Sequence, residues 1–251
     1  MRTAIVSDIH GNRTAFLAVL ADLRHTAPDL ILHGGDLADS GASPVDIVDH
    51  IRDLGWSGIA GNTDEMLYRP ESLTEFAIQT PQLAALFTAL EEMAAWTRDA
   101  LGETRLAWLR DQPRTQRHAD FALVHASPES LWRAPAHTAS DAELESAYRR
   151  QDRALAVYAH IHRPFIRSVR GFTIANTGRA GLSYDGDPRA AYLLLDDSTP
   201  TIRRVEYDIH REIQALTDSA LPHADWIVKT LQAAAPVAIP ATTQAPSASP
   251  G

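Results

Sequence analysis

The chain has 251 residues, 45% of them apolar, which is enough for one large domain or two small ones. Its 23 basic and 32 acidic residues give a net charge of −9. This balance argues against a nucleic-acid clamp or a surface held to anionic lipid, because both need a basic face. The absence of cysteine excludes disulfides, thiolate metal sites and cysteine nucleophiles.

No apolar stretch approaches the ~18 residues that span a bilayer. The N-terminal residues contain no apolar region typical of a signal peptide. We therefore expect a cytoplasmic protein with no membrane partner and no stable nucleic-acid partner. The sequence does not predict an oligomeric state.

Short apolar runs alternate with amphipathic stretches, a pattern typical of α/β layering. Five buried strands are predicted, at residues 3–7, 30–33, 57–60, 121–124 and 155–158. Helices are predicted between them, at residues 12–24, at 44–54, at 71–111 with breaks near Pro81 and Gly102, and at 140–150.

The apolar period changes to two in the last third of the chain, which predicts antiparallel hairpins. The hairpins are expected at residues 166–175 and 191–207, the second with its loop at 196–200. Helices are expected after them at 209–216 and 225–231. We predict two mixed sheets covered by helices, in a single domain of residues 1–232 with a mainly helical insertion at about 66–120. Residues 233–251 are rich in Ala, Pro, Thr and Ser and are expected to form a flexible tail.

Five of the predicted strands end on residues that bind metals. The residues that follow them are Asp8-Ile9-His10, Gly34-Gly35-Asp36, Gly61-Asn62-Thr63-Asp64, His125 and His160-Ile161-His162. Each piece alone fits an ordinary turn or a core histidine. Their joint occurrence at strand ends favours one site, because the carboxyl ends of neighbouring parallel strands meet at one edge of a sheet.

These side chains comprise two carboxylates, four imidazoles and one amide oxygen. Seven donors are too many for one tetrahedral ion and suit two ions that share a carboxylate. Nitrogen and oxygen donors without sulfur favour two divalent transition-metal ions, with manganese first and iron, zinc, nickel or cobalt as alternatives.

This set of motifs, in this order, resembles the calcineurin-like metallophosphoesterase superfamily over roughly residues 1–207. Asp8-Ile9-His10-Gly11-Asn12 also resembles the opening of its small bacterial phosphodiesterases. The resemblance implies a four-layer αββα sandwich with the metal site at the carboxyl edge of the strands. It implies Asp8, His10 and His162 on one ion, Asn62, His125 and His160 on the other, and Asp36 bridging. A metal-bridging hydroxide would then attack phosphorus.

One position departs from the family pattern. Many members have a histidine where this chain has Thr63, and that histidine is thought to protonate the leaving group. A threonine hydroxyl is too weak an acid for that role at neutral pH. Asp64, which would orient such a histidine, has no histidine to orient in this chain. We therefore expect faster turnover of esters with acidic leaving groups. The candidates for a replacement acid are His118, His137 and Tyr184.

Two further residues are candidates for binding the substrate. Asn12 fits either a contact with the substrate or a cap on the first helix. Arg179 could donate hydrogen bonds to a phosphate oxygen, or it could be an exposed arginine in a loop. The tryptophans Trp96, Trp108 and Trp132 fit core packing better than a base-stacking platform.

The leading interpretation is a metal-dependent phosphodiesterase acting on a small phosphoester. The alternatives are a phosphomonoesterase, a hydrolase of nucleotides or dinucleoside polyphosphates, and a non-catalytic metal-binding scaffold. The complete set of seven donors weighs against the scaffold.

Overall fold

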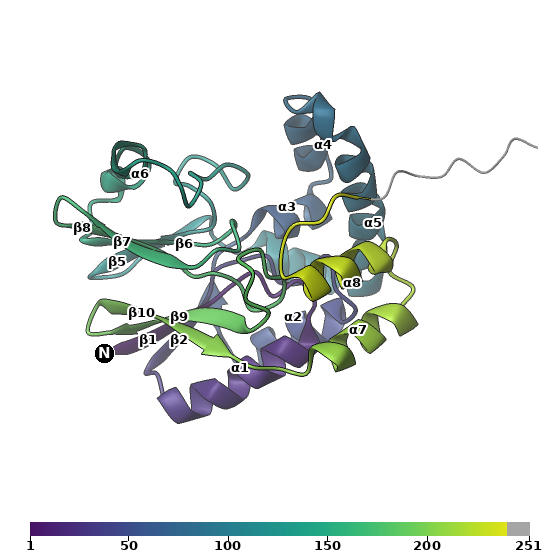
Figure 1. Cartoon of the computed structure of the whole chain (residues 1–251), viewed down its shortest axis with the longest axis horizontal. Coiled ribbons are helices and arrows are strands. Elements are labelled where there is room, and N and C mark those ends of the chain that lie inside the picture. Colours follow the sequence, from purple (N-terminus) through teal and green to yellow (C-terminus); the bar gives the residue numbers. More distant parts are fainter. Residues whose placement is uncertain (240–251) are drawn as a thin grey trace, which may run out of the picture.

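The computed structural model describes residues 1–239 and contains two five-stranded sheets that lie face to face (Figure 1). The strands of the first sheet, in spatial order, are β10 (Thr199–Val205), β9 (Ala190–Asp196), β1 (Arg2–Val6), β2 (Leu30–His33) and β3 (Ser57–Gly58). Those of the second are β4 (Thr115–Arg117), β5 (Phe121–Val124), β6 (Leu155–Tyr158), β8 (Phe172–Asn176) and β7 (Phe165–Val169).

Both sheets are mixed, with a parallel centre. Strands β1, β2 and β3 are parallel to one another, and the β9–β10 hairpin joins them antiparallel to β1. Strands β5, β6 and β8 are likewise parallel, with β4 and β7 antiparallel at the two edges. The carboxyl ends of the parallel strands therefore meet at one edge of each sheet.

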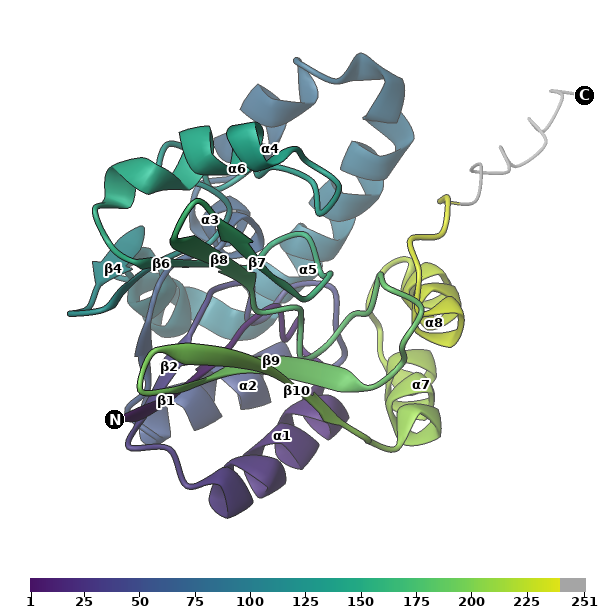
Figure 2. The ribbon, with the colours of Figure 1, turned by 60° about the vertical axis from the view of Figure 1, so that its left-hand side comes forward.

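The helices are α1 (Arg13–Thr26), α2 (Pro44–Asp53), α3 (Asn62–Tyr68), α4 (Glu71–Ala77), α5 (Ala84–Arg110), α6 (Asp141–Tyr148), α7 (Ile209–Asp218) and α8 (Ala224–Ala233). Two short 3₁₀ segments, Pro81–Leu83 and Arg149–Gln151, complete the elements. Helices α1 and α2 cover the first sheet and α6 covers the second, so the molecule has four layers (Figure 2). This confirms the predicted sandwich of two mixed sheets flanked by helices.

The alternation of side chains along the strands builds these layers. On β1, Ala4 and Val6 point to the cluster under α1 and α2, whereas Ile5 points to the cluster between the sheets. On β6, Leu155 and Val157 face the same inter-sheet cluster, and Tyr158 faces the cluster under α6. Strands buried on both faces read as continuous apolar runs, which is why they were predictable.

The local signals for helices also hold. Asn12 caps α1, since its side chain accepts a hydrogen bond from the backbone N of Ala15 at 2.9 Å. Ser140 and Glu143 form the predicted capping box of α6. The expected breaks are present, because α4 ends before Pro81 and α5 is interrupted at Gly102, where φ is 65° and ψ is 168°.

Four elements differ from the prediction. One of them is helix α3, since no helix was predicted to begin at Asn62. Strand β4 was not predicted; it has only three residues, with no buried side chain to create a pattern. Strand β3 spans two residues rather than four. The loop predicted at 196–200 shrinks to a turn of Asp197 and Ser198, both at positive φ, because the strands continue through Asp196 and from Thr199.

The first residues of the predicted tail pack against the protein. The indole Nε1 of Trp226 donates a hydrogen bond to the carbonyl of Val237 at 2.8 Å, and Val237 and Ile239 contact the apolar cluster around α7 and α8. The rest of the predicted tail, residues 240–251, lies outside the described residues. Among the described residues, no helix has the length and apolar character required to cross a membrane.

Candidate metal centre

Seven predicted ligands lie at the carboxyl ends of the two sheets. The first sheet and the helix after it supply Asp8, His10, Asp36 and Asn62, in the loops after β1 and β2 and at the start of α3. The second sheet supplies His125, His160 and His162, in the loops after β5 and β6. Residues that are up to 154 positions apart in the sequence therefore converge between the two sheets.

Two groups of donor atoms form this convergence. In the first, atoms of Asp8, His10, Asp36 and His162 all lie within 4.8 Å of one another. The Nε2 atoms of His10 and His162 are 3.2 Å apart, and His162 Nε2 lies 3.3 Å from Asp8 Oδ1. All four side chains are buried.

The second group contains Asp36, His125 and His160, again within 4.8 Å of one another. Asn62 joins it through Oδ1, which lies 3.0 Å from His125 Nε2 and 2.8 Å from His160 Nδ1. Asp36 belongs to both groups. Its Oδ2 lies 3.2 Å from Nε2 of His125 and 3.8 Å from Nε2 of His10.

The backbone orients three of the imidazoles. The Nδ1 atoms of His10, His125 and His162 lie within hydrogen-bond distance of the carbonyls of Asp39, Gly34 and Leu182, at 3.0, 2.8 and 2.6 Å. A carbonyl only accepts, so each Nδ1 carries the proton and each Nε2 presents a lone pair to the centre. Ligating histidines in proteins typically make this second contact. His160 differs, because it faces the centre with Nδ1.

The backbone at the site is strained. Five of the seven predicted ligands have positive φ, namely Asp8, His10, Asp36, His160 and His162, with values from 48° to 66°. This conformation is uncommon for residues other than glycine, and such strain clusters at functional sites. The surrounding loops hold these residues in place at a cost in free energy.

Asp64 holds two of these loops together. Its carboxylate accepts hydrogen bonds from the backbone N of Asp36, Leu37 and Gly61, at 2.8, 3.0 and 3.0 Å. The sequence alone indicated no role for Asp64, because no histidine follows Asn62. These three hydrogen bonds show that Asp64 holds the two loops together. Gly61 permits the close approach, since a Cβ at this position would lie 2.0 Å from Oδ1 of Asp36.

The charges of the centre depend on one another. Burial would raise the pKa of Asp36, but the adjacent His125 outweighs it and holds that pKa well below its usual range. Conversely, burial lowers the pKa of His125, and the Asp36 carboxylate reverses this and raises it to about 9. Without a cation, His125 therefore carries a second proton on Nε2 and pairs with the ionised Asp36, and a metal ion would take the place of that proton.

The two predicted substrate-binding residues are held within the protein. Asn12 donates from Nδ2 to the carbonyl of Gly181 at 2.9 Å while its Oδ1 caps α1. Arg179 is 1% exposed and pairs with Asp185 at 2.9 Å, and it also contacts Ser183. Of the two alternatives for Arg179, the exposed loop arginine is wrong, because the loop that carries Asp185 folds back over the guanidinium.

Thr63 lies beside the centre. Its backbone N donates to Asp36 Oδ1 at 2.9 Å, and its hydroxyl is buried without a hydrogen-bond partner among the described residues. Of the candidate replacement acids, only Tyr184 lies near the centre. His118 stacks on Phe121, and neither His118 nor His137 belongs to the two donor groups.

Several supporting residues were not recognised in the sequence. Ser7 donates a hydrogen bond to Asp8 Oδ2 at 2.6 Å, and Thr177 lies 2.6 Å from the same Ser7 hydroxyl. Asp39 is fully buried and accepts from Ser40 and Thr97, and burial raises its pKa to about 7. The spacing of these residues carries no signal, since only the packing of the loops brings them to the centre.

The predicted tryptophans pack against apolar clusters, as expected. Trp108 and Trp132 contact the cluster under the first sheet, and Trp96 contacts the cluster around α7 and α8. Trp132 also donates from Nε1 to Glu65 at 2.7 Å.

The donor set fits divalent metal ions. Three imidazole lone pairs and two carboxylates converge in a buried space, and the 3.2 Å approach of His10 Nε2 to His162 Nε2 places two lone pairs against each other. A cation between them would turn this repulsion into attraction.

Comparison with known proteins shows which family the chain is similar to. The profile of the calcineurin-like phosphoesterase superfamily domain matches residues 1–199. An uncharacterized protein of Methanocaldococcus jannaschii, MJ0912, is 27% identical, and the match covers 91% of this chain and 96% of that protein.

Solved structures agree. A metallophosphoesterase from Sphaerobacter thermophilus superposes with a TM-score of 0.75 at 25% identity, covering 93% of this chain and 99% of that one. The hypothetical protein PH1004 from Pyrococcus horikoshii OT3 superposes with a TM-score of 0.79 at 18% identity, covering 94% and 99%, which shows a shared fold. Members of this family depend on divalent metals, and this chain has the Asp and His groups to bind them. The chain belongs to the calcineurin-like phosphoesterase superfamily.

Proposed function

We propose that the protein is a phosphodiesterase that uses two divalent ions, with manganese as the first candidate. The observation that carries this proposal is the position of Asp36, whose Oδ2 faces His125 on one side and His10 on the other. A carboxylate that faces two sets of donors suits a bridging ligand.

The donors divide between the two ions according to distance. Asp8, His10 and His162 would hold the first ion, and Asn62, His125 and His160 would hold the second. Two divalent ions carry +4 against −2 from Asp8 and Asp36. The remaining positive charge favours an anionic phosphoester even though the chain as a whole carries −9.

When bound, the ion pair would activate water and neutralise charge that develops on the phosphoryl oxygens. The residues of the chain hold the ligand atoms in place. The N–H of Thr63 fixes Asp36 Oδ1 and leaves Oδ2 free for the ions, and backbone carbonyls hold three imidazoles in one tautomer. The hydroxyl of Thr63 is a weak acid, so it gives a departing alkoxide little help. We therefore propose diesters with acidic leaving groups as the preferred substrates.

Hydrolysis of bis(4-nitrophenyl) phosphate, with manganese added and after chelation, tests this proposal. We expect manganese to stimulate turnover and His162→Ala to reduce it beyond the roughly 100-fold that losing an outer partner of a metal site costs. His118→Ala is the matched control, because it removes a histidine outside both donor groups, and it should leave the rate unchanged.

Two outcomes would contradict the proposal. Stoichiometric metal binding without hydrolysis of any phosphoester, under any transition metal, would identify a scaffold. Faster turnover of 4-nitrophenyl phosphate than of the diester would identify a monoesterase.

A further inference from the structure

An apolar pocket of about 480 Å³ lies between α5, α8 and the segment 236–239. Its volume falls within the range of small-molecule sites. Its walls include six large side chains, namely Leu86, Leu90, Tyr184, Trp226, Val237 and Ile239.

Tyr184 connects this pocket to the candidate metal centre. Its ring stacks on the imidazole of His162, with centroids 4.4 Å apart and an interplanar angle of 18°. The same ring forms a wall of the pocket. One aromatic ring therefore separates a predicted metal ligand from a large apolar space.

The loop that carries Tyr184 is fixed on both sides. On the side of the centre, the carbonyl of Leu182 lies 2.6 Å from Nδ1 of His162. On the side of the pocket, the N–H of Gly186 donates to the carbonyl of Ala234 at 2.9 Å, just after α8. The indole of Trp226 in turn holds Val237 in the opposite wall. The pocket is thus built from parts tied to one another and to the centre.

The side chains that line the pocket indicate which kind of chemical group would bind in it. The described residues that line the pocket carry no formal charge, so a charged group would lose its hydration there without gaining a partner. The aromatic side chains of Tyr184 and Trp226 favour a flat ring.

We infer that this pocket binds an uncharged, largely apolar ring carried by the phosphoester, while the phosphate lies at the metal centre beyond Tyr184. This inference rests on the proposed function and adds the class of substituent that the substrate carries. Tyr184 and the pocket walls then determine specificity, and the metal centre recognises the phosphate alone.

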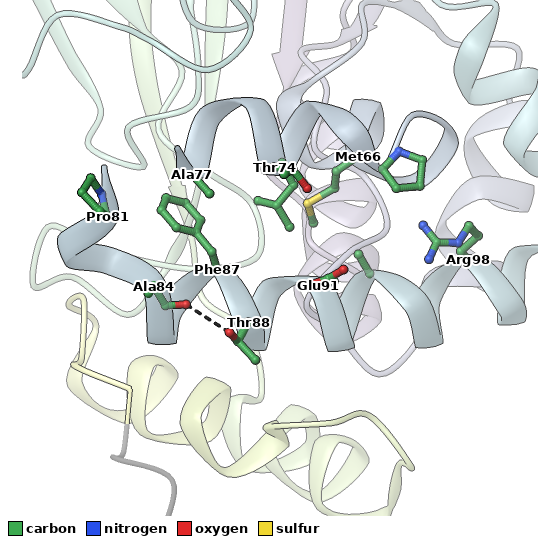
Figure 3. A pocket seen from close by; sticks show the side chains of 12 residues that line it. Met66, Thr74, Ala77, Pro81, Ala84, Phe87, Thr88, Glu91 and Arg98 are labelled. Carbon is green, nitrogen blue, oxygen red and sulfur yellow. Dashed lines mark hydrogen bonds between the residues drawn. The ribbon is translucent and has the colours of Figure 1, made fainter. Parts of the chain in front are cut away.

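A second pocket provides the control. It has a volume of about 260 Å³ and lies between α3, α4 and α5, where Met66, Ala77 and Phe87 contribute to its walls (Figure 3). The charged residues Glu91 and Arg98 also line it. Neither pocket is lined by a predicted metal ligand, but no residue of this one stacks on a ligand as Tyr184 does on His162. Neighbouring residues of α5 enter different pockets, because Ala84 lines this one and Ala85 lines the apolar one. Both alanines are exposed, so either position accepts a larger side chain.

Calorimetric titration of the manganese-loaded protein with diphenyl phosphate and with dimethyl phosphate tests the inference. We expect diphenyl phosphate to bind at least roughly tenfold more tightly, because its rings leave water. Ala85→Trp should fill the pocket and bring this ratio close to one, and Ala84→Trp should leave it unchanged. The KM for bis(4-nitrophenyl) phosphate should rise by a similar factor in Ala85→Trp only.

The outcomes separate the two proposals. Equal affinities of the wild-type protein for the two diesters, or identical ratios in Ala85→Trp and Ala84→Trp, would overturn the pocket while measured hydrolysis still supports the phosphodiesterase. A ring preference that Ala85→Trp removes, in a protein that hydrolyses no phosphoester, would support the pocket and overturn the proposed function.

Discussion

The two donor groups of the candidate metal centre differ in their access to solvent. Asp8, His10 and His162 in the first group are buried, and each imidazole there presents Nε2. In the second group His125 and Asn62 are also buried, whereas His160 is partly exposed and faces the centre with Nδ1. Asp36 is common to both.

The difference indicates separate tasks. The first group lies closed beneath loops fixed by backbone carbonyls, which suits an ion that stays in place. The second includes the partly exposed His160, which under the proposed function suits an ion that meets the substrate. Four variants test this difference between the two groups.

Asp36→Asn should have the largest effect, because it weakens both groups at once. The amide keeps the shape of the side chain but removes the charge that two ions would share. We expect loss of both ions and a fall in kcat/KM larger than the roughly 10²–10³-fold that losing a single preorganised donor costs. Elemental analysis of the purified variant measures the ions per chain.

His125→Ala should affect only the second group. The variant should lose most of one ion per chain and retain the ion held by Asp8, His10 and His162. Comparison with Asp36→Asn is the control for this prediction. Equal residual occupancy in the two variants would contradict the bridging role of Asp36.

Asp64→Asn should lower the stability of the protein without removing a predicted metal ligand. An amide nitrogen would face N–H groups where the carboxylate now accepts three backbone hydrogen bonds. We expect the free energy of unfolding to fall by about 2–3 kcal/mol, the scale of losing hydrogen bonds to a charged group. Chemical denaturation measures it, and the exposed Asp120→Asn should change it by less than about 0.5 kcal/mol.

Thr63→His should have the smallest effect, and a selective one. An imidazole at this position would donate a proton to the leaving group, so rates should rise by roughly tenfold or more for alkyl esters and little for aryl esters. Rates across a series of leaving groups measure this. Equal gains across the series would exclude the proton-donating role.

Most donors of the candidate site were predictable because they follow short apolar runs that form the central strands of the sheets. Runs such as Ile5-Val6 and Leu155–Tyr158 identify buried parallel strands, and the residue after each run must lie at the edge of the sheet. The helix caps Asn12 and Ser140 and the break at Gly102 were likewise local signals.

The supporting residues were not predictable by the same reasoning. Asp64 accepts from a loop 27 and 28 positions earlier in the chain, and Arg179 is buried because a following loop folds over it. Nothing local distinguishes either residue from a surface side chain.

The sequence alone therefore predicted the central strands and most of the helices, the sandwich of two sheets and the seven donors that converge. These depend on periodicity and on the ends of strands, which are properties of short segments. Only the tertiary structure decided that Asp36 faces both donor groups, which nitrogen each imidazole presents, and that Tyr184 lies between His162 and an apolar pocket. These depend on how loops distant in sequence pack together, and no local pattern encodes that packing.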